Sequence, residues 1–173
     1  MRLSLKIVAV LLLGLVCGCS SYHVRTTRDE FNGDTSNWML MNRLAGGALL
    51  DVDTGLELNP ARFIVKNKTL YVLTVAYSGK DWIFIDKGES LVLLVDSQRL
   101  GFSGEGSLSS RNVHSGGSVL EQAIYEVSLK DLITIANATE VKVRVMGSSG
   151  LIDRHFKKAN FKNFKKFVTE YGK

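Results

Sequence analysis

Sulfur and imidazole groups are the side chains of this 173-residue chain with the widest chemical repertoire, and both are sparse. The chain has two cysteines, Cys17 and Cys19, and three histidines, His23, His114 and His155. The histidines lie far apart, and no two have the helical or strand spacing of metal ligands. Both cysteines precede residue 20, so the rest of the chain has no thiol for a disulfide, for catalysis or for a metal site. We therefore expect no metal and no cofactor.

The carboxylates form no complete catalytic motif either. Asp53-Thr54-Gly55 occurs once, whereas an aspartic protease needs two such carboxylates that share a proton. Asp51 and Asp53 lack the third acidic ligand and the turning glycine of a calcium loop. His114 lies in a glycine- and serine-rich loop and could act as a base. An exposed loop histidine without a catalytic role is the simpler interpretation, so the sequence predicts no catalytic residue.

The first 18 residues have the parts of an export signal. Arg2 and Lys6 provide a positive start, and residues 7–16 form an almost entirely aliphatic run. This run has the length of a signal core and is much shorter than the roughly 20 residues that a membrane-spanning helix needs. Gly18 is the small residue required before the cleavage site. We expect a signal peptide over residues 1–18, cut between Gly18 and Cys19.

The tetrapeptide Val16-Cys17-Gly18-Cys19 resembles the lipobox of bacterial lipoproteins, a family defined by export and acylation rather than by one fold. The resemblance implies a diacylglycerol thioether on Cys19, cleavage before it, and a third acyl chain on the freed amino group. Cys17 departs from the pattern, because Ala, Ser or Thr is usual there. Acylation at Cys17 would place the bulky Val16 before the cut, so Cys19 is the better acceptor. The alternative is an ordinary secretory signal followed by a free cysteine.

Two or three acyl chains would keep the mature protein on a bilayer, since one chain alone holds a protein only marginally. Ser20 stands where an Asp would signal retention in the inner membrane of enteric-type bacteria. The resemblance therefore implies a cell-envelope protein, anchored in the outer membrane where the organism has one.

Positive charge is concentrated at the C-terminus. The chain has 22 basic and 17 acidic residues, and residues 154–173 contain seven cations with one acid, Glu170. Asn160 is expected to cap a final helix with two different faces. One face would carry aromatic and apolar side chains and the other lysines; the apolar positions are Phe161, Phe164, Val168 and Tyr171, and the basic ones include Lys162, Lys165 and Lys166. The basic face could meet a membrane or a polyanion, although the alternative is that the aromatic face packs on a sheet while the lysines are solvated.

The body of the chain is dominated by apolar residues at period two, which predicts short antiparallel strands. Tyr71, Leu73, Val75 and Tyr77 would share one face of a strand over 70–77. Further strands are expected at 63–65, 82–85, 91–95, 99–102, 122–127, 139–146 and 151–156. In 139–146 the valines would point inward and Glu140, Lys142 and Arg144 outward.

A short helix interrupts the strands after Ser128-Leu129-Lys130-Asp131, which has the form of a capping box. Its apolar face would consist of Leu129, Leu132, Ile133 and Ala136. The resulting fold class is α+β: a mainly antiparallel sheet or two-layer sandwich with two short helices near the C-terminus. We expect a lipidated N-terminus and tether over 19–30 and a single domain over 31–173.

These observations favour a non-enzymatic, lipid-anchored envelope protein that binds a partner protein or an envelope polymer, or has a structural role. Its expected partners are the bilayer, through acylated Cys19, and an envelope protein or anionic polymer, but not nucleic acid. Candidate binding residues are Lys162, Lys165, Lys166 and His114. The alternative is an envelope hydrolase whose site is assembled only in three dimensions.

Overall fold

The computed structural model describes residues 22–46, 54–107, 111–113 and 117–173. These residues form ten strands and two helices, in the order β1 (His23–Arg28), β2 (Thr35–Leu40), β3 (Gly55–Val65), β4 (Lys68–Gly79), β5 (Gly88–Val95), β6 (Gln98–Gly104), β7 (Arg111–Val113), β8 (Val119–Val127), α2 (Leu129–Asn137), β9 (Val141–Gly147), β10 (Gly150–His155) and α3 (Lys158–Tyr171).

All ten strands belong to one antiparallel sheet. The main path of the sheet is β1-β2-β3-β4-β8-β6-β5-β9-β10, and β7 adds to β8. The predicted antiparallel sheet with two helices is therefore confirmed. Because the described strands form one continuous sheet, an arrangement of two separate sheets is not confirmed.

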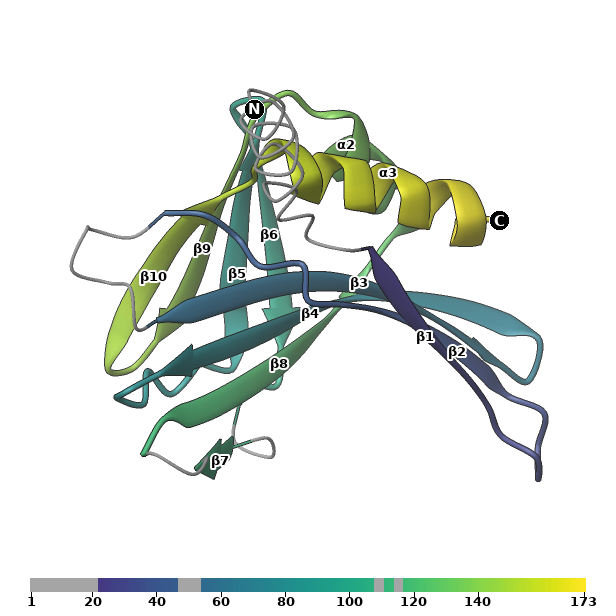
Figure 1. Ribbon diagram of the computed structural model, residues 1–173, viewed down its shortest axis with the longest axis horizontal. Helices are drawn as coiled ribbons and strands as arrows, with labels where there is room; N and C mark the ends of the chain where they lie inside the picture. Colours follow the sequence, from purple (N-terminus) through teal and green to yellow (C-terminus); the bar gives the residue numbers. More distant parts are fainter. Residues whose placement is uncertain (1–21, 47–53, 108–110, 114–116) are drawn as a thin grey trace, which may run out of the picture.

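The sheet bends sharply where β6 meets β8. These strands share a single residue pair, Gly104 with Tyr125. A Cβ atom on Gly104 would lie 2.6 Å from the carbonyl oxygen of Ile124, so only glycine permits this close approach without a backbone shift. Past the bend, β5, β6, β9 and β10 cross over β3, β4 and β8, and both helices lie at one end of the sheet (Figure 1).

Residues 41–46, which follow β2 and are called the closing segment below, close the curled sheet. The pairing of β2 with β3 changes register by one residue between Trp38–Ala61 and Arg43–Glu57. Met41 lies in this β-bulge with a φ of 61°. Beyond the bulge, Ala45 exchanges two backbone hydrogen bonds with His155 of β10, of 2.9 and 2.8 Å. The segment is thus bonded to β3 on one side and to β10 on the other.

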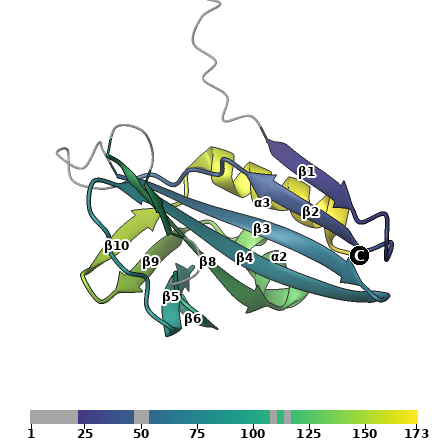
Figure 2. The same ribbon diagram turned by 90° about the horizontal axis from the view of Figure 1, so that it is seen from below.

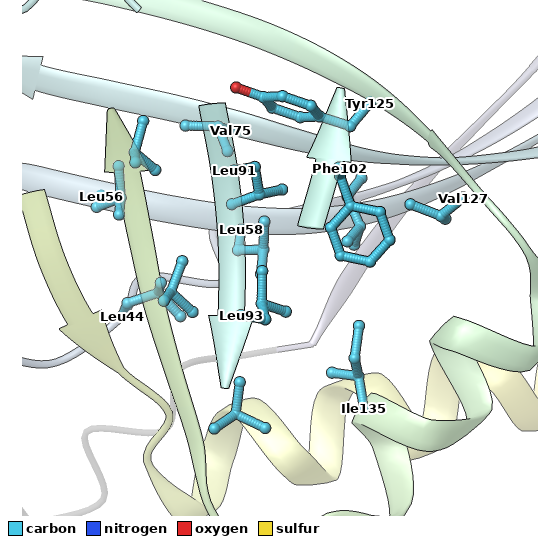
Figure 3. Packing of buried hydrophobic residues seen from close by; sticks show 14 of the residues in the cluster. Leu44, Leu56, Leu58, Val75, Leu91, Leu93, Phe102, Tyr125, Val127 and Ile135 are labelled. Carbon is cyan, nitrogen blue, oxygen red and sulfur yellow. The ribbon is translucent and has the colours of Figure 1, made fainter. Parts of the chain in front are cut away.

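The core fills the space between the two halves of the sheet. As the period-two pattern predicts, the inward residues of β4 are all buried, namely Tyr71, Leu73, Val75 and Tyr77. The valines of β9 are buried as well, whereas Glu140, Lys142 and Arg144 are exposed. In Figure 3, Leu56 and Leu58 of β3 approach Leu91 and Leu93 of β5, and Ile135 of α2 closes the cluster from below.

Helix α2 has the predicted capping box but a different buried face. The Asp131 amide donates to the Ser128 hydroxyl at 3.1 Å, and the Ser128 amide donates to the Asp131 carboxylate at 3.0 Å. Leu132, Ile135 and Ala136 are buried, while Ile133 is 40% exposed. The prediction that Ile133 faces the core was wrong, because the side of α2 that carries Ile135 packs against the sheet.

Two further sequence predictions change in the structure. Residues 23–28, which the sequence analysis assigned to a tether, form β1 and pair along their whole length with β2. Residues 82–85 were expected to be a strand, but they form an irregular segment in which only Ile85 makes a bridge, to Gly147. The reason is a buried carboxylate, described below, that takes up the amide groups of this segment.

Candidate functional site

Several sequence-predicted site residues lie outside the described residues. Gly18, Cys19 and His114 are all in this group. Lys162, Lys165 and Lys166 are described, and all three are exposed on one side of α3. The aromatic stripe of α3 packs on the core as the second of the two interpretations expected, with Phe164 fully buried. Phe167 is also fully buried, and the predicted stripe missed it.

Asparagine side chains hold α3 in place. The helix begins at Lys158 rather than after a cap at Asn160. Asn160 lies inside the first turn and accepts a hydrogen bond from the Lys157 amide at 2.7 Å. Its Nδ2 and that of Asn163 donate to Oδ1 of Asn42, at 2.9 and 3.2 Å. Because these three amide side chains are buried and hydrogen-bonded to one another, they fix the helix against the segment that closes the sheet.

A groove crosses the outer face of β5, β9 and β10. It encloses about 820 Å³. Its side chains form two rows across the strands, which follow from the pairing of Val92 with Arg144 and of Leu94 with Lys142. On β10 the rows continue through Asp153 and His155; on β6, Arg99 lies opposite Leu94. The floor is thus apolar, from Val92 and the 41% exposed Leu94, and the walls are charged.

Three cations of the groove are paired with neighbouring carboxylates. Arg144 binds Asp153 through two nitrogens, at 2.7 and 2.6 Å. Lys142 lies 3.2 Å from Glu140, and Arg99 pairs with Glu89. The hydrogen bonds from Arg144 hold the pKa of Asp153 below its usual value, despite some burial. The groove therefore combines a hydrophobic floor with ion-paired walls.

A carboxylate on a neighbouring turn shapes the rim of the groove. Asp96, with a φ of 46°, accepts hydrogen bonds from the amides of Thr139 and Glu140, at 2.9 and 2.8 Å. The Thr139 hydroxyl also donates to it, at 2.8 Å. These bonds lower the pKa of Asp96. Since Thr139 and Glu140 line the groove, the β5–β6 turn positions its rim.

Sequence reasoning found the outward charges of β9 but not the groove that they line. The alternation of Glu140, Lys142 and Arg144 was visible, and a strand was expected over 151–156, but the face on which Asp153 and His155 lie was not predicted. The sequence did not reveal that β5 pairs with β9, because the two strands are separated along the chain by β6, β7, β8 and α2.

A second carboxylate, which is buried, organises residues 83–85. Glu121 of β8 is fully buried. Its carboxylate accepts hydrogen bonds from the amides of Ile83, Phe84 and Ile85, at 2.6, 3.0 and 3.0 Å, and from the Ser107 hydroxyl at 2.6 Å. Successive amides around one anion form a nest, which explains why this segment does not pair as a strand. Glu121 is fully engaged in holding the chain, so its role is structural.

The described residues provide neither a metal site nor a membrane-spanning helix. They contain no group of three or more His, Cys, Asp or Glu side chains placed to hold a metal ion. Neither helix in this part of the chain has the length and apolar character needed to cross a bilayer. Comparison of the chain with protein-family models, with curated proteins and with solved structures finds no match.

Proposed function

We propose that this chain is a lipid-anchored protein of the bacterial cell envelope that binds a partner protein through the groove on β5, β9 and β10. The anchor is supported by the export signal and by the sequence Val16-Cys17-Gly18-Cys19. The acyl chains on Cys19 would keep the protein on the membrane. Ser20 supports the outer membrane as its location.

The observation that carries the binding role is the composition of the groove. Its apolar floor, with Leu94 exposed between charged walls, resembles a protein interaction surface, where a hydrophobic centre is surrounded by polar groups. Arg99, Lys142 and Arg144 are already ion-paired with Glu89, Glu140 and Asp153. An anionic polymer would have to compete with these carboxylates, so a polypeptide with apolar and mixed polar side chains fits the groove better.

The competing hypothesis is an envelope hydrolase that uses the two carboxylates lining the groove. Asp153 lies opposite Arg144, and Glu140 is four residues away from Arg144 along the chain. At about 3.3 Å per residue of strand, the backbones of Glu140 and Asp153 are offset along the strand direction by roughly 13 Å. Paired carboxylates of glycosidases lie about 5–9.5 Å apart. Asp153 also has a lowered pKa, which disfavours a role as general acid at neutral pH.

Two measurements test the proposal. Intact-mass spectrometry of protein purified from its native membrane should show cleavage before Cys19 and the added mass of acyl chains. For the groove, the lipidated protein is captured in mild detergent as wild type, as Leu94→Glu and as Ile124→Glu, and the co-purifying proteins are quantified. Ile124 is the matched control because it is 52% exposed on the outer face of β8, away from the groove.

We expect Leu94→Glu to reduce recovery of a specific partner by at least about tenfold, which corresponds to about 1.4 kcal/mol of binding free energy. Ile124→Glu should leave recovery unchanged. An unmodified Cys19 would refute the anchor. Equal recovery with all three proteins would refute the groove as the binding surface.

A further inference from the structure

The exposed side of α3 is strongly basic. All six lysines in residues 157–173 are exposed: Lys157, Lys158, Lys162, Lys165, Lys166 and Lys173. Glu170 is the only acid in this stretch, and it lies 3.8 Å from Lys166. Within the described part of the chain, Lys162 and Lys165 form no ion pair. Because the aromatic side of α3 is occupied by the protein core, the lysine side is the part of the helix that can meet a partner.

The described chain starts beside this basic face. The Tyr22 hydroxyl donates a hydrogen bond to the Glu170 carboxylate at 2.7 Å. The Lys166 ammonium lies 4.3 Å from the centre of the Tyr22 ring, within the range of a cation–π interaction. Burial and the Glu170 contact raise the pKa of Tyr22, so this hydroxyl stays protonated as a donor. In Figure 2, β1, which follows Tyr22, is on the same side of the molecule as α3, and Figure 1 shows that β1 starts below the helix and then runs away from it.

The position of Tyr22 limits how far the basic face can be from an acylated Cys19. Only Ser20 and Ser21 separate Cys19 from Tyr22. Three residue steps of fully extended chain span at most about 11 Å. Tyr22 would therefore lie within about one and a half Debye lengths of the headgroups at physiological ionic strength, where this length is about 8 Å, and Lys166 lies beside Tyr22.

We propose that the lysine face of α3 docks on the anionic surface of the same membrane leaflet that holds the Cys19 acyl chains. The inference rests on the proposed lipid anchor and adds an orientation to it. The occupant is the bilayer because a tether this short allows little else between the face and the headgroups. The contact is electrostatic rather than insertive, since Phe164 and Phe167 are buried and Phe161 and Tyr171 pack against the core.

The orientation has a consequence for the groove. With α3 against the membrane, the β9–β10 hairpin lies at the opposite end of the molecule (Figure 1). The outer face of β5, β9 and β10 then extends away from the bilayer beside α3, so the groove stays open to a partner. Docking would hold the groove at a fixed height and direction.

The orientation can be measured with fluorophores on single cysteines in the lipidated protein. Thr169→Cys places a label on the exposed side of α3, and Ser149→Cys places one at the tip of the β9–β10 hairpin. If Cys19 is acylated, either substitution provides the only free thiol of the mature chain. The protein is bound to phosphatidylcholine vesicles, with or without phosphatidylglycerol, that contain a headgroup-attached quencher. Flotation of the vesicles reports the anchor separately.

We expect quenching at position 169 to exceed that at 149 several-fold in vesicles with phosphatidylglycerol. Each lysine near an anionic surface strengthens the contact about fivefold, so Lys162→Gln, Lys165→Gln and Lys166→Gln together should abolish the difference. The matched triple variant of exposed lysines outside α3, Lys66→Gln, Lys68→Gln and Lys87→Gln, should retain it.

The outcomes separate the two proposals. A protein that floats but shows equal quenching at both labels overturns the orientation and leaves the anchor intact. An undiminished difference without phosphatidylglycerol, or in the α3 triple variant, overturns the electrostatic contact. A protein that does not float, with Cys19 unmodified, overturns the anchor and with it this inference.

Discussion

At the scale of single residues, acidic side chains fix the irregular parts of this fold. Glu121 accepts hydrogen bonds from three consecutive amides and a hydroxyl, and Asp96 accepts them from two amides and a hydroxyl. In both cases a carboxylate accepts hydrogen bonds from backbone amides that are not paired with a neighbouring strand. The two carboxylates differ in their exposure to solvent, because Glu121 is buried and Asp96 is exposed. Asp96 can therefore be titrated without opening the core.

Asp96→Asn should make stability less sensitive to acid. Hydrogen bonds from the Thr139 and Glu140 amides lower the pKa of Asp96 in the folded state, so its ionised form stabilises the fold. This contribution is complete above the unfolded-state pKa, about 3.9, and is lost as the pH falls through the lower folded-state pKa. Asn tolerates the left-handed backbone of position 96 but presents only one acceptor oxygen.

The measurement is urea unfolding of both proteins from pH 7 down to pH values below the folded-state pKa. We expect Asp96→Asn to be less stable than wild type at pH 7, and the two curves to converge at the acid end. Asp81→Asn, at an exposed position, serves as the control and should follow wild type throughout. A constant difference between wild type and Asp96→Asn at every pH would contradict the assigned cause.

At the scale of elements, sequence patterns predicted the alternation of two strands and one helix cap, but not the buried face of α2. The alternation in β4 and β9 and the capping box of α2 depend on residues a few positions apart, and all three were confirmed. The face of α2 depends on where the sheet lies, and Ile133 was assigned to the wrong side. Residues 82–85 alternate like a strand, yet Glu121, which removes their amides from any ladder, is 36 residues beyond Ile85.

Helix α3 should contribute to stability through its aromatic side and not through its lysines. Phe167 is fully buried, and its ring centre lies 5.1 Å from that of Tyr171. Replacing a buried Phe by Ala removes apolar contacts and leaves a cavity, so Phe167→Ala should lower the free energy of unfolding by about 3–5 kcal/mol. Lys165→Ala is the control on the opposite, exposed side and should change it by no more than about 0.5 kcal/mol. The free energy of unfolding of the two variants is measured by chemical denaturation. Similar decreases in the two variants would contradict the packing of α3.

At the scale of the whole molecule, the fold depends on contacts that no local pattern could predict. The groove exists because β9 pairs with β5 across a long stretch of chain, and the sheet is closed by one residue, Ala45, which bonds to His155. The bulge at Met41 directs the chain to that position. The same closing segment carries Asn42, to which α3 is attached. Closure of the sheet, placement of the helix and the end of the groove at His155 are therefore coupled.

This coupling predicts that a change at Ala45 affects regions far from it. Ala45→Pro removes the amide that donates to the His155 carbonyl, and an unsatisfied carbonyl at this junction should reduce the free energy of unfolding by about 1–3 kcal/mol. Ala45→Gly keeps the amide and should cost less than about 1 kcal/mol. Hydrogen exchange gives the more specific readout: in Ala45→Pro, the His155 amide and the first turn of α3 should lose protection together, while the amides of β4 keep theirs. If only His155 loses protection, the closing segment and α3 are independent, and the coupling is refuted.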